Sequence, residues 1–209
     1  HLPPFRIGPD GRLLEWDREF PEAEPGHRHL SHLYGLYPSE LFTPETRPEQ
    51  YQAAIRSLDF RLSHGGGHTG WSRAWVACLK ARIGDAEGFY EHFTALIKDF
   101  ATSTLLDLHP PRVFQIDGNL GAVAAGIEAL VGFYDGKAHL LPALPKEWAE
   151  KGSLKGVRLP GGHLLSLAWE NGELTELSVT VGFGETVSLA FNGDVCTLHG
   201  RVGETVKLI

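Results

Sequence analysis

Methionine is absent from the 209-residue sequence, cysteine occurs only twice, and no apolar run approaches the ~20 residues that a membrane-spanning helix needs. Cys78 and Cys196 are far apart and no pair has the CxxC spacing of a metal site, so neither a disulfide nor a cysteine-held metal is expected. Because translation begins with methionine and this sequence begins with His1, we expect an internal piece or a processed product, and localisation cannot be read from it.

Positive charge is also scarce. The formal net charge is −7, and no basic cluster is denser than the stretch from Arg56 to Arg61, so we expect no nucleic-acid partner. Hydrophobic residues make up 42% of the sequence and charged residues 22%, which is typical of a globular protein rather than a disordered one.

The first part of the sequence predicts helices. Residues 1–28 are rich in proline, glycine and acidic residues and indicate an extended entry segment. Apolar residues then recur at helical spacing in five places. The expected helices run from His29 to Pro38, from Pro48 to the glycines at 65–67, from Thr69 to Ile83, over Phe89 to Phe100, and from about Leu120 to Tyr134.

The second part predicts strands. Residues 164–169 and 174–181 are β-type runs joined across Asn171-Gly172, and a further hairpin is expected at Asn192-Gly193. We therefore expect a mainly α, α+β chain, with helices over residues 1–137 and a small antiparallel β-sandwich domain over residues 138–209. Five helices do not close a ring, so they are interpreted as the second half of a larger helical barrel.

Histidines lie in the first two polar clusters. The stretch at residues 27–32 reads HRHLSH, in which Arg28 and His29 can donate hydrogen bonds to hydroxyls or to a carboxylate. Alternatively, Arg28 pairs with a glutamate at position 22 or 24, and no carboxylate or cysteine completes a metal site here. The stretch GGGHTGWS at residues 65–72 suits a sugar through His68 and Trp71, although its glycines and Thr69 also fit a plain helix N-terminus.

The third cluster runs from Asp107-Leu108-His109 to FQIDGN, which ends at Asn119. An acidic residue in front of a helix usually caps it, which would make Asp117 structural. Gly118 would instead let the backbone approach a ligand, and the amides of Gln115 and Asn119 could bind a hydroxyl or a water. Sugar hydrolysis needs such a carboxylate. Both interpretations stay open on these residues alone.

Four longer motifs occur together, in this order: HRHLSHLYGLYP, GGGHTGWSRAW, LHPPRVFQIDGN and HLLPALPKEW. In their sequence and order they resemble glycoside hydrolase family 95, the α-L-fucosidases and related α-L-galactosidases. The resemblance extends from about Gly11 to Val181. It implies an (α/α)6 barrel followed by a small β domain, a fucosylated oligosaccharide or glycan as substrate, no cofactor or metal, and a secreted or periplasmic location.

The resemblance also implies roles for single residues. Family members invert the anomeric centre, and the aspartate of the IDGN motif, Asp117 here, would activate the water. Arg28 and His29 would contact the sugar. The acid and the asparagines that assist the base would lie in a preceding barrel half. Glu15 is a candidate substitute acid, although a structural pairing is favoured, and Leu120 stands where the family usually has Phe.

These expectations favour an inverting α-L-fucosidase-type enzyme that acts on 1,2-linked residues, of which these 209 residues alone are inactive. The alternatives are an α-L-galactosidase of the same family, a non-catalytic carbohydrate-binding or structural module, and a polysaccharide lyase on a similar helical scaffold.

Overall fold

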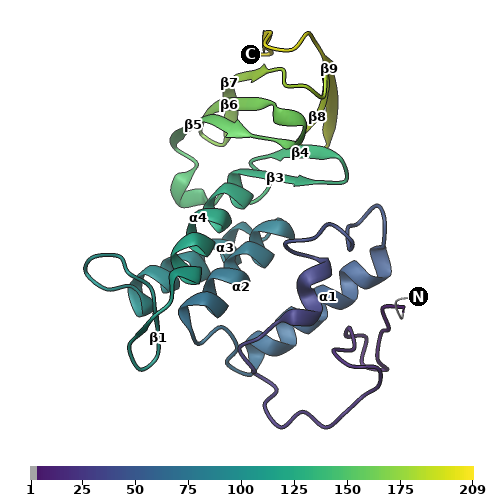
Figure 1. Ribbon diagram of the computed structural model, residues 1–209, viewed down its shortest axis with the longest axis vertical. Coiled ribbons are helices and arrows are strands. Elements are labelled where there is room, and N and C mark those ends of the chain that lie inside the picture. Colours follow the sequence, from purple (N-terminus) through teal and green to yellow (C-terminus); the bar gives the residue numbers. More distant parts are fainter. Residues whose placement is uncertain (1–3) are drawn as a thin grey trace.

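The computed structural model describes residues 4–209 and contains a helical region, residues 4–130, and a β region, residues 131–209 (Figure 1). The chain begins in loops beside the helices and ends in the outermost strands of the β region. The α-helices are α1 (Pro48–Ser63), α2 (Gly70–Arg82), α3 (Ala86–Ala95) and α4 (Ile116–Leu130). Three 3-10 turns are η1 (Ser31–Gly35), η3 (Lys146–Trp148) and η4 (Pro160–Gly162), and a π-helical turn, η2 (Leu96–Phe100), follows α3.

The expected helix from His29 to Pro38 is wrong, because only the short η1 forms there. Leu30, Leu33 and Leu36 are all buried and stand three residues apart, the repeat of a 3-10 helix rather than an α-helix. Gly35 packs so closely on Phe42 that a Cβ at this position would overlap the Phe42 ring. The leucines therefore enter the core through a tight turn.

The second and third expected helices are confirmed as α1 and α2. Pro48 is the first residue of α1, where its missing N–H costs nothing. Thr69 caps α2, because its hydroxyl accepts a hydrogen bond from the Ser72 N–H at 3.3 Å. The buried faces of both helices join one core with η1.

The fifth helix begins and ends earlier than expected. The IDGN residues lie inside the first turn of α4, and the helix ends at Leu130. Residues Val131–Tyr134 form strand β3, which pairs with β4 (Lys137–Leu140). Asp135 and Gly136 have φ of 51° and 67°, as a two-residue hairpin turn requires. The expected division at residue 138 thus falls within β4, and the extent of each domain stays a prediction.

Two sheets make up the β region. One has the order β10-β7-β6-β5 and the other β3-β4-β8-β9. Both expected hairpins are confirmed, with positive φ at the Asn-Gly pairs. The purely antiparallel arrangement is wrong, because β4 and β8 run parallel. The further strands are β5 (Lys151–Arg158), β6 (Leu164–Glu170), β7 (Glu173–Thr180), β8 (Thr186–Phe191), β9 (Asp194–His199) and β10 (Thr205–Lys207).

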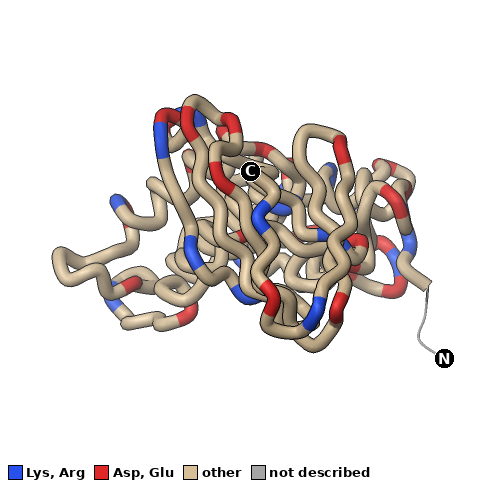
Figure 2. The backbone as a smooth tube through the Cα atoms, turned by 90° about the horizontal axis from the view of Figure 1, so that it is seen from above, with Lys and Arg blue, Asp and Glu red and all other residues tan. Residues whose placement is uncertain are grey.

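A buried apolar core lies between the two sheets, and it includes Leu165, Val179 and Leu189. Trp148 connects this region to the helices, because its ring packs edge-on against Phe89 and Phe93 with centroid distances of 5.5 Å. A small hairpin, β1 (Leu108–His109) with β2 (Val113–Phe114), projects from the helical region before α4 (Figure 1). Charged residues of both signs are spread along the chain (Figure 2).

The fold is α+β, as expected, although helices and strands occupy similar lengths of the chain rather than helices dominating. Helix α2 packs between α3 and α4. That packing is compatible with part of a helical barrel, and the barrel itself stays a prediction. Among residues 4–209, no helix is both long and apolar enough to cross a membrane.

Candidate functional site

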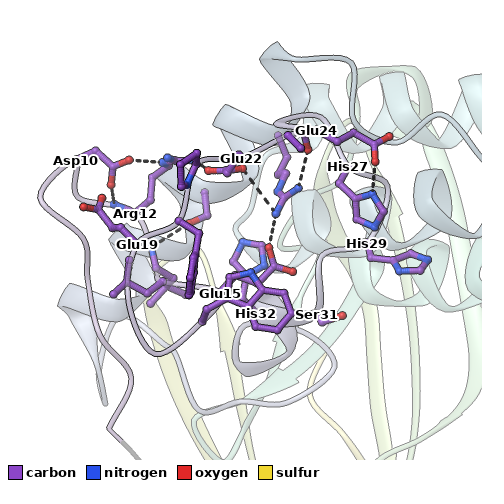
Figure 3. Close-up of a pocket in the computed structure, with 18 of the residues that line it drawn as sticks. Asp10, Arg12, Glu15, Glu19, Glu22, Glu24, His27, His29, Ser31 and His32 are labelled. Carbon is purple, nitrogen blue, oxygen red and sulfur yellow. Dashed lines mark hydrogen bonds and ion pairs between the residues drawn. The ribbon is translucent and has the colours of Figure 1, made fainter.

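The candidate residues fall into two neighbouring clusters. The first is a cavity of about 480 Å³, here called the N-terminal pocket, which is lined by residues between Asp10 and His32 together with Ser57 and Arg61 of α1 (Figure 3). The second, here called the helix junction, lies where the first turns of α2 and α4 meet and contains Asp107, Gln115, Asp117 and Asn119 together with Gly70 and Trp71.

A network of ion pairs forms one side of the N-terminal pocket (Figure 3). The buried Arg61 guanidinium donates to Glu15 Oε2 at 2.5 Å and lies 4.0 Å from Glu22. Arg12 donates to Glu22 at 2.8 Å and also binds Asp10. A carboxylate that a buried guanidinium already engages has a structural partner. The structural pairing expected for Glu15 is therefore what the structure shows.

The histidines of the HRH motif lie at the other side of the pocket. His27 pairs with Glu24 at 2.7 Å, and the His27 and His29 rings meet edge-on with centroids 4.9 Å apart. Partial burial and the charges of Arg28 and His27 lower the pKa of His29. His32 is more enclosed, and burial together with Arg61 and Arg12 lowers its pKa to about 4, which keeps this imidazole neutral.

The alternative pairing of Arg28 with Glu22 or Glu24 is wrong. Within residues 4–209, Arg28 forms no ion pair, because His27 takes Glu24 and Arg12 takes Glu22. Arg28 still lies close enough for its charge to lower the pKa of Glu24, after the larger effect of the His27 hydrogen bond. Its guanidinium has no hydrogen-bond partner among residues 4–209, so its donors are available to a ligand.

His68 lies on the side of Arg28 and Glu24. Its charge also lowers the pKa of Glu24, so it belongs to the same neighbourhood as Arg28. The exposed His68 ring has Nδ1 3.2 Å from the Gly65 carbonyl oxygen. Gly26 packs directly on the backbone of His64 and Gly66, which places the HRH loop against the glycine loop that leads into α2.

Trp71 is the second residue of α2 and belongs to the helix junction. Its half-buried ring packs on Trp75, with ring centroids 5.3 Å apart. The backbone N–H of Trp71 donates to Gln115 Oε1 at 3.0 Å, and this hydrogen bond joins the N-terminus of α2 to that of α4. Gln115 therefore has a structural contact at its oxygen.

Both polar atoms of the Asn119 side chain form hydrogen bonds to the backbone. Its Oδ1 accepts from the Asp107 N–H at 2.9 Å, and its Nδ2 donates to the Leu105 carbonyl oxygen at 2.6 Å. The side chain thus holds the loop in front of α4. Substrate binding by Gln115 and Asn119 stays a prediction, and both amides already support the backbone.

Asp117 lies in the first turn of α4, and it does not cap the helix. Gln115 occupies the N-cap position, and no side chain donates or accepts a capping bond there. The Asp117 carboxylate is exposed and makes no hydrogen bond or ion pair with any residue from 4 to 209. Leu120, one helical turn further on, is 65% exposed. The carboxylate is open to solvent and positioned at the positive end of a helix dipole.

Asp107 is the residue whose importance the sequence did not reveal. It is only 3% exposed and lies beneath the first turns of α2 and α4. Burial and the nearby charge of Asp117 raise its pKa to about 6. The sequence offers no direct signal for the burial of Asp107. Gly70 and Gly118 make room for its carboxyl group, but glycines are common at turns, and nothing in their sequence positions relates them to Asp107.

No hydrogen bond or ion pair joins the N-terminal pocket to the helix junction in the described part of the chain. No group of three or more histidine, cysteine, aspartate or glutamate residues in residues 4–209 is arranged to hold a metal ion. The structure thus brings Arg28, His29 and His68 together on one side, and Trp71, Gln115, Asp117 and Asn119 on the other.

Comparison with known proteins covers nearly the whole chain. The model of the glycosyl hydrolase family 95 catalytic domain matches residues 1–130, and that of the glycoside hydrolase family 95 C-terminal domain matches residues 134–207. Alpha-L-fucosidase 2 of Arabidopsis thaliana is 37% identical over 85% of this chain and 22% of its own length. Proteins named "Probable alpha-fucosidase A" are 29% identical, over 81% of this chain and 23% of the relative in Aspergillus niger, and over 88% and 29% in Aspergillus oryzae. The chain thus spans less than a third of the length of these relatives.

Proposed function

We propose that this chain, which belongs to glycoside hydrolase family 95, forms part of an inverting α-L-fucosidase that removes terminal 1,2-linked fucose from oligosaccharides or glycans. In this proposal Asp117 is the base that activates the attacking water. The observation that carries it is an unpaired, exposed carboxylate in the first turn of α4, within a family whose named relatives are α-fucosidases.

The chemistry of the proposed site follows from its free groups. An ionised Asp117 can accept a proton from a water that attacks C1 of the sugar. Arg28 and His29 offer donors to sugar hydroxyls, and Trp71 offers an indole surface to apolar C–H groups. An inverting site also needs an acid at about 6.5–9.5 Å from the base, with room for the water between them.

That acid is proposed to come from polypeptide outside these residues. The Glu15 carboxylate is already engaged by the Arg61 guanidinium, so Glu15 is not the proposed acid. Helix α4 in addition exposes an apolar stripe, here called the α4 stripe, formed by Ile116, Leu120, Val123 and Ile127. The spacing i, i+4, i+7, i+11 is that of a helix face that packs on another element. A preceding barrel half is the proposed cover, and the greater length of the relatives supports it.

Asp117→Asn in the complete protein tests the role of this carboxylate. Loss of a general base predicts a fall in kcat of about 10²–10⁴-fold on a 2′-fucosylated oligosaccharide. The thermal unfolding midpoint should stay unchanged, because the Asp117 side chain makes no hydrogen bond to another residue in the described chain. Asp194→Asn, at an exposed aspartate of β9, is the matched control and should retain full turnover.

Four outcomes would redirect the proposal. Near-normal turnover by Asp117→Asn would favour a non-catalytic carbohydrate-binding module. Faster hydrolysis of an α-L-galactoside than of the fucoside would favour the galactosidase alternative, and an unsaturated product absorbing in the ultraviolet would reveal a lyase. Release of fucose by residues 1–209 alone would show that no further part is needed.

A further inference from the structure

The inference concerns the buried carboxyl group of Asp107. This side chain is 3% exposed, and neither of its oxygens has a hydrogen-bond partner among the described residues. A buried polar group without a partner destabilises the folded state, and an unpaired buried charge does so more strongly. A buried orphan carboxyl group at the centre of a candidate site therefore requires a reason.

Two glycines make the space that it occupies. Gly70 is the first residue of α2, and Gly118 lies in the first turn of α4. A Cβ at either position would overlap the Asp107 carboxyl group. Neither glycine has a positive φ, so backbone conformation does not explain them. The close approach of Asp107 does.

The backbone of Asp107 is fixed to the start of α4 on both sides. Its N–H donates to Asn119 Oδ1 at 2.9 Å, and its carbonyl oxygen accepts from the Gln115 N–H at 2.9 Å. These two residues flank Asp117 in the sequence. Because Gln115 Oε1 also accepts from the Trp71 N–H, the same residues connect α4 to α2.

The charged neighbour of the carboxyl group is Asp117. Burial and then the negative charge of Asp117 raise the pKa of Asp107 to about 6, against an opposing effect of the Leu108 backbone, which lies close by but forms no hydrogen bond to the carboxyl group. The first turn of α2 carries no acidic residue. Its Arg73 is directed away, with Nη1 2.6 Å from His92 Nδ1, and in the β1–β2 hairpin His109 contacts its neighbour Pro110. Loss of the Asp107 proton thus places a second negative charge behind Asp117, and no cation among the described residues contributes to the pKa shift of Asp107.

We propose that Asp107 is a positioning residue for the candidate base Asp117, its buried carboxyl group acting as the spacer between the first turns of α2 and α4. Removal of the spacer lets these turns approach each other, which moves Asp117 relative to Trp71. The proposal rests on the proposed function for the role of Asp117, and its tests use the 209-residue chain without any measurement of hydrolysis.

The first experiment tests the packing of Asp107 against Gly118 by adding a methyl group at position 118 and removing the carboxyl group at position 107. Gly118→Ala places a methyl group in the space that the Asp107 carboxyl group occupies. It should lower the thermal midpoint by roughly 5 °C or more, as overpacking does. In an Asp107→Ala background the methyl group has room, so the same substitution should cost much less. Gly126→Ala, on the same helix, is the matched control, because its Cβ would meet only Phe93 at 4.0 Å. It should leave the midpoint equal or higher.

The second experiment separates this role from a purely structural one. The ¹³C shift of the Asp107 carboxyl carbon should titrate with a midpoint near pH 6, and Asp117→Asn should lower that midpoint because it removes a nearby negative charge. A structural spacer with no link to Asp117 would titrate identically in both proteins.

Two results would overturn the proposal. Equal costs for Gly118→Ala with and without Asp107→Ala would show that the carboxyl group is no spacer, and an unmoved Asp107 midpoint in Asp117→Asn would show that the two groups are independent. Neither result bears on fucose hydrolysis. Conversely, the complete protein could prove inactive on fucosides while Gly118→Ala still costs less stability in the Asp107→Ala background. That result would contradict the proposed function and leave the role of Asp107 as a spacer intact.

Discussion

The helical and β regions differ in how they place their large apolar side chains. In the β region, side chains from two sheets form a core in which Leu165 and Val179 are fully buried. In the helical region, the α4 stripe and the adjoining β1–β2 hairpin leave large apolar side chains exposed, including Leu120 at 65% and Phe114 at 51%. The β region also exposes apolar side chains, such as Phe183 and Val195, but at separate places, whereas the α4 stripe is one continuous helix face suited to packing on further protein.

The regions also differ in the groups they bury. The helical region buries the charged side chains or imidazoles of Arg61, Arg82, His92, Asp107 and Glu128, whereas the β region buries only the imidazole of His163. Burial of charge is costly unless the charge is paired. The stability of the helical region thus depends on specific pairings, and that of the β region on apolar packing.

The largest effect is expected from Arg82→Ala. The buried Arg82 guanidinium binds Glu128 and donates to the Leu36 and Ser39 carbonyl oxygens at 3.0 Å. Its removal leaves the buried Glu128 carboxylate unpaired, which should cost about 3–5 kcal/mol in the free energy of unfolding, measured by urea denaturation.

Lys151→Ala is the matched control for Arg82→Ala in the β region. Lys151 lies 3.8 Å from Glu170 at the surface, with the two side chains 76% and 53% exposed. Such a pair contributes about 0–1 kcal/mol. Similar losses in the two variants would remove the distinction between the regions.

A smaller effect is expected from pH, through His92 of α3. Burial, followed by the charges of Arg73 and Lys80, lowers the pKa of His92 to about 4. The folded state therefore binds fewer protons than the unfolded state between about pH 4 and 6.5, and stability falls as the pH is lowered through that range. Asp107 acts with the opposite sign, because its raised pKa makes stability fall as the pH rises from about 4 to 6.

His92→Gln should flatten the acid limb of a plot of unfolding free energy against pH, and Asp107→Asn should steepen it. An acid limb that neither substitution changes would contradict the assignment of this pH sensitivity to His92 and Asp107 of the helical region.

The smallest effect on stability is expected from Leu120→Ala in the α4 stripe. Because this side chain is exposed, the free energy of unfolding should change by less than about 0.5 kcal/mol. The same substitution at the buried Leu165 of β6 should cost about 2–5 kcal/mol. A large loss at Leu120 would show that the stripe is already covered within this chain.

Local features were predictable from the sequence where one residue type decides the backbone. Pro48 and Thr69 mark the starts of α1 and α2, and the Asn-Gly pairs mark two hairpins, as expected. The prediction failed where a distant contact decides. Gly118 was interpreted as lying before a helix, whereas it lies within α4 and makes room for Asp107.

The parallel pairing of β4 with β8 is a second feature that sequence patterns miss. Three strands of the other sheet separate these two in the chain. Hairpin signals describe only neighbouring strands. The register between strands from different hairpins depends on how the two sheets pack, and no short segment carries that information.

The sequence by itself determined the family, the order of helices before strands, and the residues offered as a site. Only the tertiary structure decided that Asp117 is no cap and has no partner among residues 4–209, that His27 rather than Arg28 pairs with Glu24, and that Asp107 is buried beneath the first turn of α4. The physical reason is the distance along the sequence between the residues that decide each feature. Motifs, caps and turns are set by neighbouring residues, whereas the burial and pairing of a charge depend on elements that meet only in the folded chain.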